Sequence, residues 1–117
     1  KLDANSSQKR EELFTVKEVI SPELIRLSNG LTVRLIGIKE DPAQNGKAND
    51  FLISKTKGKR VFLKFDSVIH DSKNNLMAYL YLENKTFLNA HLIKEVFVLV
   101  DESLNFKYRQ KFVNLLK

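Results

Sequence analysis

The dipeptide Asn29-Gly30 lies between two short runs in which apolar and polar residues alternate. In that setting Asn-Gly is the strongest short-range signal for a β-hairpin. We therefore expect a strand over 23–27 and a return strand over 31–38. A loosely alternating run over 13–20 precedes them and ends at Ser21-Pro22. Together the three runs predict an antiparallel meander at the start of the fold.

After the meander, the spacing of apolar residues predicts helices and strands in alternation. The polar stretch 39–47 contains Asp41-Pro42 and Gly46, which predicts a loop. After it we expect a helix over 47–57, strands over 60–65 and 76–82, a short helix capped by Asn89, and a final helix over 103–116. The predicted fold class is mainly β with α: a five-stranded OB-type barrel with one inserted helix and two C-terminal helices.

The chain of 117 residues has room for one domain. Residues 1–12 are mainly polar and predict a flexible leader or linker, which leaves 13–117 for the domain. Because the chain begins at Lys1 without Met, we expect it to be a piece of a longer protein. The core is expected to include Val19, Leu24, Ile25, Leu35, Ile36, Phe51, Leu63, Phe65, Leu80, Leu92 and Phe112.

Composition excludes several kinds of chemistry. The chain has no cysteine, which excludes disulfides, thiolate metal sites and a cysteine nucleophile. Its two histidines, His70 and His91, are far apart in sequence, so neither supports a metal site or a general base. No apolar run approaches the roughly 20 residues of a membrane span. We expect a cytoplasmic protein with no membrane partner.

Basic residues outnumber acidic ones by 20 to 14, which gives a net charge of +6. This surplus favours polyanionic partners through phosphate neutralisation and counterion release, although a lysine-rich soluble surface gives the same balance. The basic residues between Lys55 and Lys64 suit either a phosphate-contacting edge or a helix C-terminus with favourable cations. Lys107, Arg109 and Lys111 are expected on the solvent face of the last helix.

Tyr79 and Tyr81 alternate along a predicted strand and therefore share one of its faces. If exposed, they would be stacking platforms for single-stranded bases. The alternative, which we favour, is that they pack in the core or at its rim.

Four stretches in this order resemble the thermonuclease family, the staphylococcal-nuclease-like (SNase-like) domains. The stretches are Thr32–Ile38, Lys59–Asp66, Asn74–Tyr81 and Asn89–Lys94, and the resemblance covers about 14–116. It implies calcium-assisted hydrolysis of phosphodiesters, in which carboxylates hold the metal, a glutamate positions water and two arginines neutralise the phosphate. Hard oxygen ligands suit Ca²⁺, and guanidinium groups suit a phosphate that gains charge.

Two of the positions that matter in this family carry altered residues here. Arg34 matches the first arginine and Glu23 the first carboxylate. Asn75 stands in place of the second arginine, and Lys39 in place of the second carboxylate. Lys39 would repel Ca²⁺, and losing one charge-stabilising donor typically raises a barrier by about 2.7–4 kcal/mol.

The family's Thr-Pro-Glu turn corresponds to Glu40-Asp41-Pro42-Ala43, so Pro42 or Ala43 takes the place of the glutamate. A shift of one or two residues would bring Glu40 or Asp41 into the site instead. Our interpretation is a nuclease-like barrel without nuclease activity, metal or other cofactor. If it is active, Arg34, Glu23, Glu40 and Asp41 are the candidates. Otherwise we expect Arg34 to form an ion pair with Glu23 or Glu40.

A further set of stretches resembles the SNase-like domains appended to bacterial and archaeal DNA methyltransferases: Phe62–Asp66, Tyr79–Leu82, Lys85–Phe87 and Phe106–Tyr108. This suggests a module that binds nucleic acid or docks within a larger DNA-modifying protein, next to a neighbouring domain of the same polypeptide. Its candidate contacts to DNA are Arg34, Lys39, Lys59, Arg60, Lys64, Tyr79 and Tyr81. A divergent calcium-dependent nuclease and a purely structural packing module are the alternatives.

Overall fold

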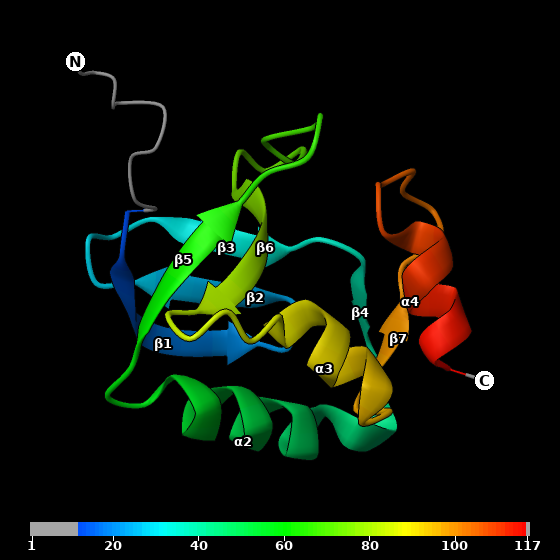
Figure 1. Ribbon diagram of the computed structural model, residues 1–117, viewed down its shortest axis with the longest axis horizontal. Helices are drawn as coiled ribbons and strands as arrows, with labels where there is room; N and C mark the ends of the chain where they lie inside the picture. Colours follow the sequence, from blue (N-terminus) through cyan, green and yellow to red (C-terminus); the bar gives the residue numbers. More distant parts are fainter. Residues whose placement is uncertain (1–11, 117) are drawn as a thin grey trace.

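Five strands close into a barrel in the computed structural model, which describes residues 12–116 (Figure 1). The order around the barrel is β1-β2-β3-β6-β5, with β3 and β6 parallel and the other pairs antiparallel. The bounds of these strands are Phe14–Ser21 (β1), Leu24–Leu27 (β2), Thr32–Leu35 (β3), Arg60–Lys64 (β5) and Leu76–Leu82 (β6). The predicted OB-type barrel with helices is confirmed, whereas the expected leader over 1–12 lies outside the described residues except for Glu12.

The β2–β3 connection is the hairpin predicted at Asn29-Gly30. Its turn is closed by a hydrogen bond from the Gly30 backbone N–H to the Leu27 carbonyl, at 2.9 Å. Gly30 has φ +94°, a left-handed conformation that glycine adopts without a steric penalty. Asn29 adds a side-chain bond, because its Oδ1 accepts from the Leu31 backbone N–H at 3.1 Å.

The expected return strand over 31–38 is divided by Gly37. The backbone leaves the barrel at this residue, which has φ +82°, and then forms a separate short strand, β4 (Ile38–Glu40). This strand pairs with β7 (Val98–Val100) in a two-stranded antiparallel sheet that the sequence analysis did not predict. A side chain at position 37 would meet the rings of Phe106 and Phe112 at 2.6–2.9 Å, so the chain needs glycine here.

Three α-helices accompany the barrel. The α2 helix (Asn45–Thr56) follows a 3₁₀ turn, η1 (Pro42–Gln44), and packs against β1, which confirms the predicted inserted helix. The α3 helix (Leu88–Lys94) packs against β6. The last helix, α4 (Arg109–Leu115), is shorter than the predicted 103–116, because 101–108 forms turns that Asp101 supports by accepting from the Ser103 backbone N–H at 3.1 Å. None of the helices within 12–116 is long and apolar enough to cross a membrane.

Asn89 is not the N-cap that the sequence suggested. It lies inside α3, is fully buried, and its side chain joins the helix to the barrel. Its Oδ1 accepts from the Leu80 backbone N–H at 2.7 Å, and its Nδ2 donates to the Ile36 carbonyl at 2.9 Å. Asn89 thus satisfies two backbone groups at the point where the parallel strands β3 and β6 lie side by side.

The core follows the prediction with one clear exception. Ile25, Leu35, Ile36, Leu80, Leu92 and Phe112 are buried, and the core also takes in residues from α3 and β7. Val19, Leu24, Phe51 and Leu63 are half-buried. Phe65 is 48% exposed, because β5 ends at Lys64 and Phe65 already belongs to the β5–β6 loop.

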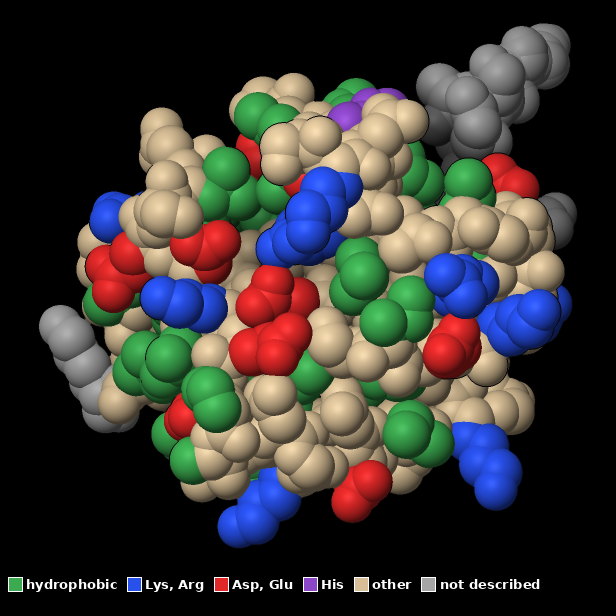
Figure 2. Space-filling view, turned by 180° about the vertical axis from the view of Figure 1, so that it is seen from behind, with side chains coloured by type: hydrophobic (Ala, Val, Ile, Leu, Met, Phe, Trp, Pro, Cys, Tyr) green, Lys and Arg blue, Asp and Glu red, His purple; other side chains and the backbone are tan. Residues whose placement is uncertain are grey.

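Figure 2 shows that acidic and basic side chains lie interspersed on the face behind the view of Figure 1.

Candidate functional site

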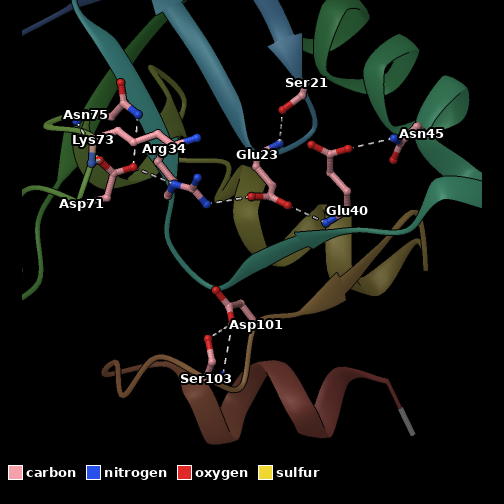
Figure 3. A network of polar contacts seen from close by, with 10 residues as sticks. All are labelled: Ser21, Glu23, Arg34, Glu40, Asn45, Asp71, Lys73, Asn75, Asp101 and Ser103. Carbon is pink, nitrogen blue, oxygen red and sulfur yellow. Dashed lines mark hydrogen bonds and ion pairs between the residues drawn. The ribbon is translucent and has the colours of Figure 1, made fainter.

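Arg34 lies on β3 between two carboxylates that come from different loops (Figure 3). Its Nη1 is 2.7 Å from Glu23 Oε1 and its Nε is 2.9 Å from Asp71 Oδ2. The three side chains are partly buried, with exposed fractions of 31% for Arg34, 19% for Glu23 and 12% for Asp71. Part of the guanidinium's hydrogen-bonding capacity is therefore already used within the chain.

Glu23 uses both carboxylate oxygens. It lies at the turn between β1 and β2, next to the Leu24–Arg34 register pair that brings it beside β3. While Oε1 accepts from Arg34, Oε2 accepts from the backbone N–H of Glu40 at 2.8 Å. Glu23 therefore ties the barrel to β4. The predicted ion pair between Arg34 and Glu23 is confirmed.

Asp71, which the sequence analysis did not select, completes the cluster from the β5–β6 loop. Its Oδ1 accepts from the backbone N–H groups of Lys73 and Asn75, both at 2.9 Å, and its Oδ2 also accepts from Asn75 Nδ2 at 3.1 Å. Burial raises the pKa of Asp71, but the hydrogen bonds from Asn75, Arg34 and Lys73 lower it more, so its pKa lies below the usual 3.8. Asp71 is therefore held as a carboxylate.

A local pattern in the sequence predicts a turn at Asp71, but not its contact with Arg34. An aspartate whose side chain bonds backbone N–H groups two and four residues later is a common turn-forming pattern, and Asp71-Ser-Lys-Asn-Asn permits it. Asn75, which the sequence resemblance aligns with the family's second arginine, takes part in this turn and directs its amide at Asp71.

Glu40 and Asp41 lie nearby but are directed elsewhere. Glu40 Oε1 accepts from Asn45 Nδ2 at 2.9 Å, so its carboxylate turns toward α2. Asp41 caps η1, because its Oδ1 accepts from the Ala43 backbone N–H at 3.2 Å. The alternative ion pair between Arg34 and Glu40 is not formed; Asp71 takes that place.

Lys39 lies on β4 and is exposed. Together with Glu23 it lines an open hollow of about 530 Å³, whose other walls include Asp101, Glu102 and Ser103. A second hollow, of about 420 Å³, lies beside Arg34 and Asp71 and shares Asp101 and Ser103 with the first. The cluster therefore opens to solvent on both sides of Glu23 and Arg34, with a lysine on one rim.

The donor set does not fit the Ca²⁺ site that the resemblance implies. Ca²⁺ takes six to eight oxygen ligands, mostly from carboxylates and carbonyls. Among residues 12–116 no group of three or more His, Asp or Glu side chains gathers so that it could hold a metal ion. The oxygens of Glu23 are engaged by Arg34 and by the Glu40 backbone, and Lys39 brings a positive charge to the same hollow.

The remaining basic candidates lie at other places on the barrel. Lys59 and Arg60 line a hollow of about 570 Å³ with Leu82, Glu83 and Asn84. Arg60 is paired there with Glu83 through two bonds of 3.2 and 2.9 Å. Lys64, at the end of β5, holds its Nζ 5.6 Å from the centre of the Tyr81 ring. The structure thus does not bring these residues together with Arg34.

Tyr79 and Tyr81 pack against neighbouring side chains, which is the alternative that we favour from the sequence. Tyr79 is 2% exposed and donates its hydroxyl to Asp66. Burial and the bond to Asp66 raise its pKa well above the usual 10. Tyr81 is half-buried, with its ring stacked between Phe62 at 5.1 Å and Phe87 at 4.6 Å. Burial, with a contribution from Tyr108, raises the pKa of Tyr81 to about 12. Neither ring has a face free for a base.

The family model described as Staphylococcal nuclease homologue matches residues 32–116, which run from the start of β3 to the end of α4. The match includes Arg34, Lys39, Asp71 and Asn75, whereas Glu23 precedes it. No curated protein matches the chain.

Proposed function

The chain belongs to the staphylococcal nuclease-like family, and from this premise we propose that it is a catalytically inactive member that binds nucleic acid. The observation that carries the proposal is the engagement of Arg34 by two carboxylates, Glu23 at 2.7 Å and Asp71 at 2.9 Å. An arginine that stabilises a scissile phosphate needs donors directed at that phosphate.

A phosphate that approaches Arg34 has to compete with both carboxylates. It would bring negative charge close to Glu23 and Asp71, and at these distances like charges repel strongly in a partly buried setting. A phosphate that displaced Glu23 and Asp71 from Arg34 would also leave these two carboxylates without their strongest hydrogen-bond donor. Arg34 is therefore better suited to holding the β5–β6 loop on the barrel than to hydrolysis.

Two substitutions weaken the catalytic chemistry independently, one at a metal ligand and one at an arginine that would contact the phosphate. Lys39 stands at the position of the family's second metal-binding carboxylate and shares a hollow with Glu23. Asn75 replaces the second arginine and serves the turn around Asp71. A slow or absent reaction follows from either change, and the two effects add.

Binding of nucleic acid rests on the charge of the chain. The net charge is +6, and phosphate contacts by lysines release counterions. We place the module within a larger cytoplasmic DNA-modifying protein such as a DNA methyltransferase, on the sequence resemblance given above. No cofactor is needed for this role.

Two assays with the 117-residue chain test the proposal. In the first, supercoiled plasmid is incubated with high protein concentration, with Ca²⁺ or with chelator; we expect no metal-dependent cleavage. In the second, labelled single-stranded and duplex DNA are titrated at several salt concentrations; affinity should rise as salt falls. Cleavage that requires Ca²⁺ and disappears in Arg34→Ala contradicts inactivity. Absence of binding at low salt contradicts the binding role.

A divergent calcium-dependent nuclease is the second candidate, because Glu23, Arg34 and Glu40 do lie in one hydrogen-bonded network. The segment from Glu40 to Ala43 would have to rearrange to free the carboxylate oxygens of Glu23 and Glu40 for a metal ion. The plasmid assay decides between this candidate and the inactive module.

A structural packing role is favoured by one further observation. Phe65, Val68 and Ile69 in the β5–β6 loop are 48%, 47% and 45% exposed. Apolar side chains gathered in one exposed loop often mark a contact with another protein surface. If the chain binds no DNA at low salt but binds an apolar dye that Val68→Ser with Ile69→Ser removes, this loop is the functional surface.

A further inference from the structure

Aromatic rings form a continuous cluster on the outer face of β5 and β6. The rings of Phe62, Tyr81 and Phe87 are stacked in that order, with centroid separations of 5.1 and 4.6 Å. Phe87 also contacts Tyr108, which lies just before α4, with a centroid separation of 5.3 Å. The ring of Tyr79 is 5.7 Å from that of Phe87 and 5.0 Å from that of Tyr108. This cluster joins segments that are far apart in sequence.

Four exposed lysines hold their ammonium groups against these rings. Lys64 Nζ lies 5.6 Å from the Tyr81 centroid, and Lys85 Nζ lies 5.9 Å from the Phe62 centroid. Lys107 Nζ is 5.4 Å from the Tyr108 centroid, and Lys111 Nζ is 5.7 Å from the same ring and 5.9 Å from Phe87. All are within the roughly 6 Å at which a cation is attracted to a ring face. We call these lysines and rings the lysine–aromatic surface.

The charges of this surface are not neutralised by neighbouring carboxylates. Within residues 12–116 none of the four lysines forms an ion pair, whereas Arg26, Arg34, Arg60 and Arg109 each do. The acidic residues nearest to these lysines in sequence are Asp66 and Glu83. Asp66 accepts from the Tyr79 hydroxyl and the Lys107 backbone N–H, and Glu83 is paired with Arg60. The surplus positive charge of the described chain is thus carried by lysines rather than arginines.

We propose that the lysine–aromatic surface is the nucleic-acid-binding site of this protein and that it contacts the sugar–phosphate backbone. This inference rests on the proposed function, but it places the contact away from the Arg34 network. The rings position the ammonium groups in advance, so less side-chain freedom is lost when phosphates bind. Because the ring faces are covered by one another and by the lysines, the surface reads charge and spacing rather than base identity.

The surface includes Lys64 and Tyr81, which the sequence had suggested, and gives each a specific part. Lys64 supplies charge, and Tyr81 supports a lysine instead of stacking on a base. Lys107 and Lys111 are exposed, as the sequence predicts, and Lys85, which the sequence offered only as part of a resembling stretch, joins them on this surface. The contact of Lys111 with Phe87 arises only when α4 docks onto the barrel, whereas Lys85 lies over Phe62 of β5 and Lys107 over its neighbour Tyr108.

The test compares two variants of the full chain with equal loss of charge. The first, Lys64→Gln with Lys85→Gln and Lys111→Gln, removes three charges from the surface. The matched control, Lys17→Gln with Lys47→Gln and Lys94→Gln, removes three exposed charges from β1, α2 and α3. Binding of a 20-nucleotide oligo(dT) and of a 20-base-pair duplex is measured by fluorescence anisotropy across a salt series.

For the surface variant we expect affinity at low salt to fall about tenfold or more, and the slope of log K against log salt to fall by roughly 2 to 3. The control should stay within about threefold of wild type. Loss with oligo(dT) alone identifies a single strand as the ligand, and loss with both probes identifies the backbone of either form. Lys64→Arg with Lys85→Arg and Lys111→Arg should bind as wild type does, which guards against a folding defect.

Other results overturn the inference in distinguishable ways. If wild type binds neither DNA at low salt, the proposed function itself is wrong. If wild type binds but both Gln variants lose affinity equally, or the surface variant loses none, only the location is wrong. Binding to phosphatidylserine vesicles that the surface variant loses, with DNA binding unchanged, would make the occupant a membrane surface instead.

Discussion

At the scale of single residues, a few polar side chains decide how parts of the chain are joined. Asn89 shows this most clearly, since its buried amide satisfies the Leu80 N–H and the Ile36 carbonyl together. Buried backbone groups without partners are costly, so the identity of this side chain matters more than its volume.

Asn89→Ala should therefore destabilise the fold strongly. Two buried backbone groups lose their partner, which costs roughly 2–4 kcal/mol of unfolding free energy. The measurement is urea denaturation followed by circular dichroism. Asn105→Ala, at an exposed position, is the control and should leave the midpoint almost unchanged. Equal midpoints for the two variants would show that water replaces the amide.

Arg34 and Arg26 offer a second comparison at this scale. Arg34→Ala leaves the carboxylates of Glu23 and Asp71 without their charged donor, and we expect a loss of about 1–3 kcal/mol. Arg26→Ala breaks a pair with Glu18 in which both side chains are about half exposed, and it should cost less than about 0.5 kcal/mol. Chemical denaturation of both variants measures the difference, and a similar cost for both contradicts a structural role for Arg34.

The residue scale also shows what a sequence can and cannot predict about the site. Glu23 and Arg34 lie on two strands joined by a recognisable hairpin, so their pairing followed from the spacing along the chain. Asp71 is 37 residues from Arg34 and lies in a long loop. Its position depends on how that loop folds back onto the barrel, and no local pattern specifies this.

At the scale of elements, the pairing of β4 with β7 was the main feature missing from the prediction. Each strand has three residues, and about sixty residues separate them in sequence. Such short segments carry little periodicity, and Gly37 looked like part of a longer strand. The barrel strands and α2, which have clearer patterns, were located from the sequence to within a few residues.

Gly37→Ala tests the importance of this break. The substitution strains a backbone with φ +82° and forces a methyl group against Phe106 and Phe112, which should cost about 2–5 kcal/mol. Gly46→Ala is the matched control, because this glycine lies in α2 with open space around it. A helical Gly→Ala change should raise stability by about 0.5–1 kcal/mol. Thermal unfolding of both variants checks the opposite signs.

At the scale of the whole molecule, two aspartates link stability to pH. Hydrogen bonds from the Tyr79 hydroxyl and the Lys107 and Ser67 backbones lower the pKa of Asp66, against burial, and Asp71 is lowered as described above. The folded chain then binds fewer protons than the unfolded chain near and below pH 3.8. The contribution is present above that pH and is lost as pH falls through the folded pKa values.

We therefore expect the melting temperature to fall as the pH drops below about 4. Asp66→Asn and Asp71→Asn should be less stable than wild type at pH 7 but should lose less on acidification, since the titrating group is gone. Asp50→Asn, at an exposed position on α2, should follow the wild type. Parallel curves for all four proteins would mean that other carboxylates govern the acid limit.

Asp66 has a consequence beyond stability. It bonds the Tyr79 hydroxyl within the barrel and the Lys107 backbone in the segment that leads into α4, so one carboxylate fastens the end of the chain to its middle. Together with the packing of buried Phe112, this attachment positions Lys107, Tyr108 and Lys111. A chain cut short before this segment would keep Lys64 and Lys85 but lack Lys107 and Lys111, so under our proposal it should bind DNA more weakly than the whole chain does.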